Sequence, residues 1–255
     1  MALSRWKPVA VCVTGFAHQE NDLPCQDFYA VTAFDDWFIA TVSDGAGTAV
    51  NSSEGSAAIC KAVVDKLIFQ ILNSPAQYAT DIASEIKQWV EAEIQSVRAQ
   101  LVTDGAGSLA SFHATLVGVV ANKQGGVFFH IGDGAGVAMA SDDYRSFVIS
   151  GPENGEYPDE TFFFTDPEWQ RHLRMTSFGG EYDLIVLMTD GVTPFALAQG
   201  ATGPHLPFFE PVSRHLATCT SEDGERALAD TLGQIAIRRI TSDDKTMVWA
   251  MRGDA

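Results

Sequence analysis

Nine short apolar runs, rich in β-branched and aromatic residues, constrain the fold of this chain most strongly. Each run is bounded by Gly, Asp, Asn or Pro, which is typical of strands in a sheet. Residues 122–126 and 142–145 are connections of hairpin length, so much of the sheet is expected to be antiparallel. The nine runs are PVAVCVTGF, DFYAVTAF, WFIATVSD, HATLVGVVAN, GVFFHIGD, GVAMAS, SFVIS, DLIVLMTD and KTMVWAMR.

Helices are expected in three places. Residues from about 52 to 72 and from about 80 to 101 carry apolar side chains at i, i+3 and i+4, which is the spacing of one helix face. A third helix is expected from about residue 222 to 238. Apolar residues on these faces are interpreted as core.

Two Gly- and Pro-containing stretches interrupt this pattern. Residues 151–175 and 199–211 are interpreted as irregular insertions, the first ending in a short helix near Trp169. Strands, a helical pair, more strands, and a final helix and strand indicate an α+β fold. No linker or low-complexity stretch divides the chain, so residues 1–255 are expected to form a single domain.

The charge balance narrows the function classes. Thirty-three acidic residues against sixteen basic ones give a net charge of −17. Such a field disfavours nucleic acid and anionic membrane surfaces as partners, since both attract clusters of Lys and Arg. It is compatible with binding of divalent cations. No stretch approaches the roughly 20 apolar residues of a membrane span.

The cysteines and the N-terminal segment indicate a cytoplasmic protein. Cys12, Cys25, Cys60 and Cys219 are widely spaced and include no Cys-x-x-Cys motif, so they are expected to be reduced thiols. The apolar start of the chain resembles a signal peptide, but Pro8 and the alternating pattern favour a first β-strand.

Four aspartates stand at the ends of expected strands. Asp44 and Asp190 end two of the runs, Asp27 opens another, and Asp243 precedes the last. Carboxylates brought together repel one another and resist ionisation unless a cation lies between them. A site made only of oxygen ligands suits Mg²⁺ or Mn²⁺. These residues are therefore candidates for a metal site.

The residues of five sequence segments, and their order along the chain, strengthen the hypothesis of a metal site. Along nearly its whole length the chain resembles the metal-dependent PP2C-type (PPM) protein serine/threonine phosphatases, and most closely their bacterial variants. The segments match the family's early Gln-Asp motif, its Asp-Gly-x-Gly loop and helix, its Gly-Asp hairpin, its Ser-Asp-Gly motif and its closing Asp-x-x-Thr. They are CQDFYAV, FIATVSDGAGTAVNSSEGSAAI, ASFHATLVGVVANKQGGVFFHIGDGAGVAMASDD, DLIVLMTDGV and SDDKTMVWAM.

The resemblance implies a four-layer α-β-β-α sandwich and a hydrolase of bacterial signalling. It implies hydrolysis of phosphoserine and phosphothreonine in proteins, the products of a Ser/Thr kinase, through a water bridged by two Mn²⁺ or Mg²⁺ ions. A pseudophosphatase, or a regulatory module that binds phosphoproteins without turnover, is the alternative. It is favoured by the loss of a phosphate-gripping arginine and opposed by retention of the aspartates.

The resemblance also implies a ligand set by matched position. Asp44 would bridge both ions, and the carbonyl of Gly45 would bind one of them. Asp190 and Asp243 would complete the ligands of the first ion, and Asp27 would hold waters of the second.

Departures from the family pattern leave three roles open. Asp133 matches a carboxylate that can help bind a third ion, but Pro194 stands where an acidic partner is common. Asp22 occupies the place of the phosphate-gripping arginine, so His18 or a distant arginine would have to contact the phosphate. Ala46 replaces the histidine that is a candidate general acid in eukaryotic members.

Two other glycine-rich segments are interpreted as binding neither a metal ion nor a cofactor. The DGAG copy that begins at Asp104 matches no family motif and is interpreted as a loop that ends a helix. Gly132, Gly134 and Gly136 follow a strand, as in a dinucleotide-binding loop. That fingerprint, however, needs a helix there and a further glycine beyond the second one, and the chain offers Val137 and a turn instead.

Overall fold

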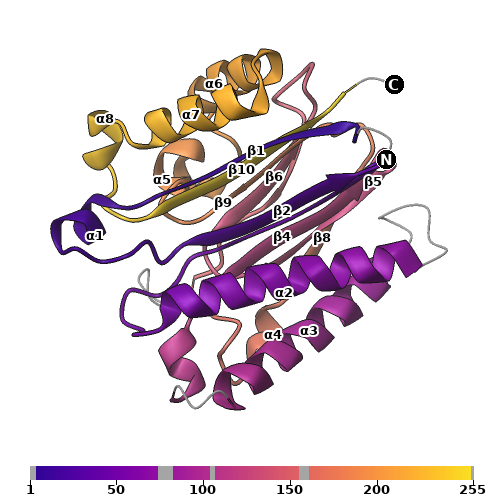
Figure 1. Cartoon of the computed structure of the whole chain (residues 1–255). Coiled ribbons are helices and arrows are strands. Elements are labelled where there is room, and N and C mark those ends of the chain that lie inside the picture. The colour runs from indigo at the N-terminus through magenta and orange to yellow at the C-terminus, as the bar shows by residue number, and fades with distance from the viewer. Residues whose placement is uncertain (1–3, 74–82, 104–106, 155–160, 254–255) are drawn as a thin grey trace.

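Ten strands form two five-stranded sheets that pack face to face (Figure 1). The structure is a computed structural model that describes residues 4–73, 83–103, 107–154 and 161–253. Every strand pair in these residues is antiparallel. The first sheet consists, in spatial order, of β1 (Trp6–Val13), β10 (Lys245–Arg252), β9 (Leu184–Met188), β6 (Ala135–Met139) and β7 (Phe147–Ser150). The second consists of β2 (Phe28–Phe34), β3 (Trp37–Ser43), β4 (Leu116–Asn122), β5 (Gly125–Ile131) and β8 (Arg174–Gly179).

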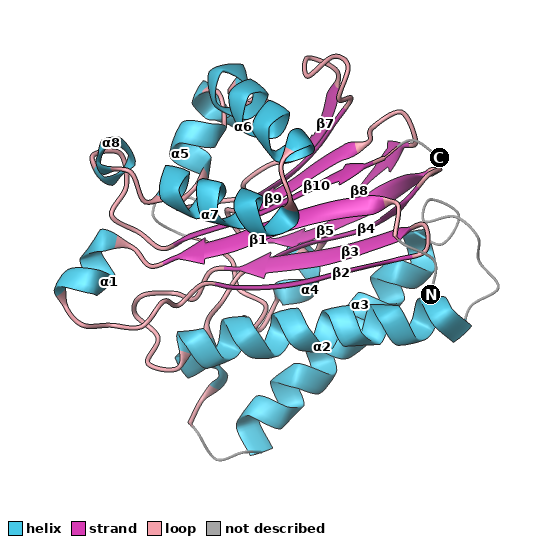
Figure 2. Cartoon of the chain, turned by 45° about the horizontal axis from the view of Figure 1, so that its top comes forward, coloured by secondary structure: helices cyan, strands magenta, loops and turns pink. Residues whose placement is uncertain are grey.

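Helices cover the outer face of each sheet (Figure 2). The long helices α2 (Ser52–Asn73) and α3 (Ala83–Thr103) pack on the second sheet, and α6 (Leu206–Thr218) and α7 (Ser221–Leu232) on the first. The predicted four-layer α+β sandwich is therefore confirmed. The short helical elements are α1 (Phe16–Glu20), α4 (Trp169–His172), α5 (Thr193–Ala196), α8 (Ile235–Arg238) and the 3₁₀ turns η1 (Leu109–Phe112) and η2 (Gln199–Ala201).

The central strands are apolar on both faces because each face meets another layer. In β9, Val186 belongs to the core under α6 and α7, whereas Ile185 and Leu187 belong to the core between the two sheets. In β3, Ile39 packs in the core under α2 and α3, and Phe38 lies between the sheets. This double burial explains why these strands read as continuous apolar runs.

Two elements that begin within the expected irregular stretches correct the sequence-based prediction. Strand β8 runs along the edge of the second sheet, where the residues of RMTSFG are mostly half-buried and give little apolar signal. Helix α6 forms although Pro207 and Pro211 suggested a loop. Pro207 lies in the first turn, where a missing N–H costs nothing, and Pro211 is accommodated inside the helix.

The third expected helix is broken in two. Helix α7 ends at Leu232, where the amide of Gly233 donates to the carbonyl of Ala229, and α8 begins at Ile235. Glycine at this position lowers the stability of a continuous helix by about 1 kcal/mol. The short helix expected near Trp169 is present as α4. The Asp104 loop lies outside the described residues.

The antiparallel order brings many strand ends to one end of the sandwich. The register pairs Phe28 with Ser43 and Leu116 with Ile131, so β2 and β4 begin where β3 and β5 end. In the first sheet, β9 ends beside the start of β6 and of β10. The loops at this end carry the aspartates singled out above. Within the described ranges, no helix has both the length and the apolar composition needed to cross a membrane.

Candidate metal centre

Three aspartates from three different strand ends converge. Asp44 follows β3, Asp133 follows β5, and Asp190 follows β9. Each offers one carboxylate oxygen, and these oxygens all lie within 4.8 Å of one another. Two of the strands belong to the second sheet and one to the first, so the group forms across the sandwich.

The loop that carries Asp44 is fixed by the start of the neighbouring strand. The amide of Asp44 donates to Oγ1 of Thr115 (3.0 Å), and the amide of Thr115 donates to the carbonyl of Asp44 (2.8 Å). Gly45 is buried, and a Cβ there would lie 2.7 Å from the carbonyl oxygen of Gln26. Glycine is therefore needed for the close approach of these two segments.

Asp27 lies within interaction distance of Asp44 and is almost fully buried. The hydroxyl of Thr189 donates to Oδ2 of Asp27 (2.8 Å) and accepts the amide of Thr246 (3.0 Å). Thr189 thus links Asp27 of the second sheet to β9 and β10 of the first. Sequence reasoning did not single out Thr189, although it directly precedes Asp190.

Asp243 and Asp244 play different structural parts. Asp243 is exposed, whereas Asp244 is buried. The carboxylate of Asp244 accepts the amides of Gly15 and Gln26, both at 2.6 Å, and it contacts Nδ1 of His18 at 2.9 Å. Asp244 therefore ties α1 and the segment before Asp27 to the start of β10. Sequence reasoning singled out Asp243 as a candidate ligand and did not mark Asp244.

Burial and mutual repulsion raise the pKa of the clustered carboxyls. Burial is the main cause for Asp44, whose pKa is also raised by the charges of Asp27, Asp243 and Asp133. Burial likewise raises the pKa of Asp190, with further contributions from Asp44, Asp133 and Asp243. The same main cause raises the pKa of Asp27 and of Asp133. Asp243 thus acts electrostatically on the group from its exposed position.

A buried lysine lies beside the acidic group. Lys245 is only 2 % exposed, and its Nζ donates to the carbonyl of Asp243 at 2.5 Å. Burial lowers the pKa of its ammonium group, and the charges of Asp243, Asp244 and Asp27 oppose that shift. The sequence did not mark Lys245, because it reads there as the first residue of an apolar strand.

Several carboxylate oxygens in the group are buried without a hydrogen-bond donor. Among the described residues, Oδ1 of Asp27, Oδ1 of Asp133 and Oδ1 of Asp190 are in this state. An unpaired buried carboxylate oxygen is costly unless a cation binds it. Oxygen-only ligands suit hard divalent cations such as Mg²⁺ and Mn²⁺. The residues present therefore fit a metal site.

Comparison with known proteins places this arrangement in a family. The model of the protein phosphatase 2C family matches residues 14–233. The chain belongs to the protein phosphatase 2C family. It is 27% identical over 260 residues to "Serine/threonine-protein phosphatase 3" of Escherichia coli (strain K12), covering 96% of this chain and 98% of that protein. The predicted class, a protein serine/threonine phosphatase, is thereby confirmed.

Solved structures share the fold of this protein phosphatase 2C chain. A bacterial serine phosphatase has a TM-score of 0.67 at 16% identity, with 97% of this chain and 98% of that chain covered. The catalytic domain of the phosphatase PstP, solved with two manganese ions, has a TM-score of 0.63 at 14% identity, with 98% and 99% covered.

The residues at which this protein phosphatase 2C chain departs from the family pattern lie in several different elements and loops. His18 lies on α1, with one ring nitrogen engaged by Asp244. Asp22 is exposed and has a positive φ of 53°. The amide of Ala46 donates to the carbonyl of His113 (2.9 Å), and Pro194 is part of α5. The phosphate contact expected of His18 stays a prediction.

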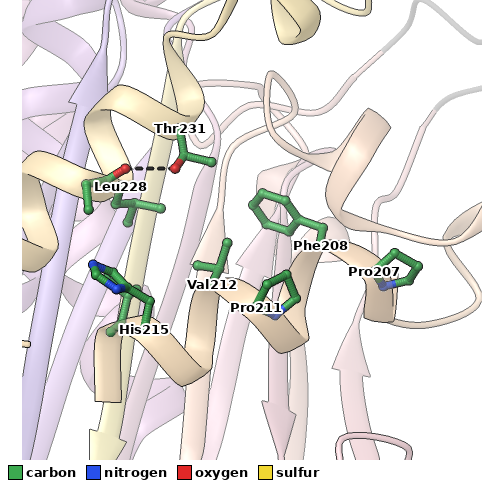
Figure 3. A pocket seen from close by; sticks show the side chains of 9 residues that line it. Pro207, Phe208, Pro211, Val212, His215, Leu228 and Thr231 are labelled. Atoms are coloured by element: carbon green, nitrogen blue, oxygen red, sulfur yellow. Dashed lines mark hydrogen bonds between the residues drawn. The ribbon is translucent and has the colours of Figure 1, made fainter. Parts of the chain in front are cut away.

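The surface also has a groove that does not involve the residues of the metal centre. An apolar groove of about 320 Å³ lies between α6 and α7 and includes Phe208, Val212 and Leu228 (Figure 3). None of the residues that line it belongs to the loops that carry the aspartates.

Proposed function

We propose that this chain is a metal-dependent phosphatase that hydrolyses phosphoserine and phosphothreonine in proteins. The observation that carries the proposal is the convergence of Asp44, Asp133 and Asp190, with buried carboxylate oxygens that lack donors, in a protein phosphatase 2C chain. The substrates would be products of a serine/threonine kinase. The net charge of −17 favours divalent cations and gives no basis for binding nucleic acid.

We assign the metal ligands by combining the family pattern with the geometry. Asp44 is proposed to lie between two ions, with the carbonyl of Gly45 on one of them. Asp190 and Asp243 would complete the first ion, and Asp27 would orient waters of the second. The mutual effects of these carboxyls on their pKa values support this grouping. Asp133 lies within the same three-oxygen group and is the candidate for a third ion.

The chain's own contribution to the chemistry is the placement of these oxygens. Two bound Mn²⁺ or Mg²⁺ ions would acidify a shared water and neutralise charge on the phosphoryl group. Thr189 holds Oδ2 of Asp27 and leaves Oδ1 free of protein donors. Thr115 fixes the backbone of Asp44. Preorganised ligands of this kind avoid the cost of reorganisation during the reaction.

A specific observation favours the alternative of phosphoprotein binding without turnover. Asp22 presents an exposed carboxylate at the position of the family's phosphate-gripping arginine, where it would repel phosphate. Phosphate release from phosphoserine and phosphothreonine peptides distinguishes the two functions. We expect release with Mn²⁺ or Mg²⁺ and its loss in EDTA. Peptide binding without release would establish the alternative, and release that persists in excess chelator would exclude the metal-dependent reaction.

Replacement of Asp44 by alanine tests the central ligand. We expect Asp44→Ala to lower turnover at saturating Mn²⁺ by at least a hundredfold (about 2.7 kcal/mol of barrier), because one carboxylate serves both proposed ions. Calorimetric titration should show fewer bound Mn²⁺ ions than in the wild type. Asp142→Ala, in the exposed turn between β6 and β7, is the matched control and should behave like the wild type. Two-ion binding in Asp44→Ala, or more than a tenth of the wild-type rate, would refute the bridging role.

A further inference from the structure

Two cysteines that form no Cys-x-x-Cys motif in the sequence lie in direct contact in the structure. Cys12 is in β1, and Cys25 is in the segment that leads into β2. Their sulfur atoms are 3.0 Å apart, and both residues are free and half-buried. A disulfide has an S–S distance of about 2.05 Å, so the two sulfurs need to approach by about 1 Å to form one.

The other two cysteines have different surroundings. Cys60 is fully buried, and its thiol faces the carbonyl of Phe28 at 3.7 Å. Cys219, the residue directly after α6, contacts the carbonyl of Leu216 in that helix at 3.7 Å. Among the four, Cys12 and Cys25 have sulfurs in contact with each other, and both have some access to solvent.

We propose that Cys12 and Cys25 are a modification site that forms a reversible disulfide on exposure to a peroxide. One thiol attacks the peroxide O–O bond and becomes a sulfenic acid, releasing one water. The second thiol then attacks that sulfur, the S–O bond breaks, and a second water leaves. The two sulfurs together lose two electrons and two protons, and hydrogen peroxide is reduced to two waters. A small dithiol restores the thiols by disulfide exchange.

The disulfide acts on the segment that carries Asp27. Both thiols also approach the carbonyl oxygen of Asp27, Cys12 at 3.8 Å and Cys25 at 3.9 Å. The new bond ties the end of β1 to the segment before β2, so both adjust to the disulfide geometry. Asp27 is two residues from Cys25, and its carboxylate accepts the hydroxyl of Thr189, so a shift of its segment moves the carboxylate relative to the other acidic residues. Metal sites lose affinity when their supporting groups are displaced. This effect on metal binding rests on the proposed function.

Oxidation of the wild-type protein tests the modification site directly. The purified, reduced chain is treated with hydrogen peroxide, and its disulfides are mapped by mass spectrometry of peptides prepared without reductant. We expect a Cys12–Cys25 disulfide that dithiothreitol removes, formed before Cys60 or Cys219 reacts. It should be absent in Cys12→Ser and Cys25→Ser and unchanged in the matched control Cys219→Ser. Overoxidation of single cysteines without this bond, or bonds only to Cys60 or Cys219, would overturn the proposal.

Calorimetric titration with Mn²⁺ tests the effect on the metal site. We expect the oxidised protein to bind Mn²⁺ at least about threefold more weakly than the reduced protein, with recovery after reduction. Cys12→Ser treated with the same peroxide should show no change. Equal affinity of both forms, with the disulfide present, would overturn the link to Asp27. Because neither measurement uses phosphatase activity, failure of the proposed catalytic function would be recognised separately.

Discussion

Lys245 shows how one residue can balance the charge of an acidic centre. Its ammonium group is buried next to Asp243 and within electrostatic range of Asp244 and Asp27. A buried lysine is expensive to maintain unless negative groups surround it. In the protein without metal, Lys245 offsets part of the repulsion among the carboxylates. The same positive charge also opposes the entry of a divalent cation.

Replacing Lys245 by methionine should therefore strengthen metal binding. Removing one positive charge near the site changes the binding free energy on the order of 1 kcal/mol, which is about fivefold in Kd. Titration calorimetry with Mn²⁺ measures this change. Lys123→Met, in the exposed turn between β4 and β5, is the control and should leave Kd unaltered. Weaker Mn²⁺ binding in Lys245→Met would mean that the lysine supports the ligands instead of competing with the ion.

At the scale of elements, neighbouring strand ends are brought together by glycines that leave no room for a side chain. Gly191 follows Asp190 at the end of β9, next to the start of β10. A Cβ on Gly191 would lie 1.8 Å from the carbonyl oxygen of Asp244. Gly47, in the loop after β3, has a more open environment: a Cβ there would lie 3.8 Å from a side-chain oxygen of Gln26, which is an ordinary contact distance.

Gly191→Ala should separate the loops that carry Asp190 and Asp243. We expect a loss of about 1–3 kcal/mol in the free energy of unfolding, because backbone atoms have to move. Binding of Mn²⁺ should weaken by about tenfold or more, since the two proposed ligands are displaced from each other. Urea unfolding and calorimetry measure the two effects. Gly47→Ala should be close to the wild type in both. A Gly191→Ala variant with wild-type Mn²⁺ affinity would show that the two loops do not act together.

The sequence predicts elements well where burial makes them apolar. The central strands, such as β4 and β9, were predicted because both of their faces are buried. The edge strand β8 was missed because its half-buried residues give no clear alternation. Helix α6 was missed because its stability comes from packing of residues such as Phe209 and Leu216 against the first sheet, which outweighs its two prolines.

The candidate metal centre could be predicted from the sequence only in part, because some of its residues act through partners far away in the chain. Asp44 and Asp190 were marked by their place at the ends of apolar strands, and the structure brings them together with Asp133. Thr189 and Asp244 act through partners that are more than 150 residues away in the chain, at Asp27 and Gly15. Local patterns carry no information about such partners.

For the whole molecule, the raised pKa values make stability depend on pH. Burial raises the pKa of Asp27, Asp44 and Asp190 above the ordinary value of 3.8. Such a carboxyl group binds its proton more tightly in the folded chain than in the unfolded one. Its contribution to stability is fully present below pH 3.8 and is lost as the pH rises through the folded-state pKa. The metal-free protein therefore loses stability from this group on going towards neutral pH.

Asp44→Asn isolates this contribution. Without metal, the free energy of unfolding of Asp44→Asn should exceed that of the wild type at pH 8, and the difference should shrink as the pH falls, because a protonated Asp44 and an asparagine are both neutral. Saturating Mn²⁺ should reverse the order at pH 8. Urea unfolding of both proteins at several pH values, with and without Mn²⁺, measures these free energies of unfolding. A difference that is constant with pH would show that Asp44 ionises freely in the folded protein.

The position of β10 has a consequence for synthesis of the protein. This strand lies between β1 and β9 in the first sheet, and Asp243 and Asp244 lie directly before it. A chain that is still being translated cannot join β1 to β9 or anchor α1 until β10 has left the ribosome. Contacts over such long sequence separations also form slowly. The proposed metal site, which includes Asp243, is therefore incomplete in the newly made protein until β10 has been translated.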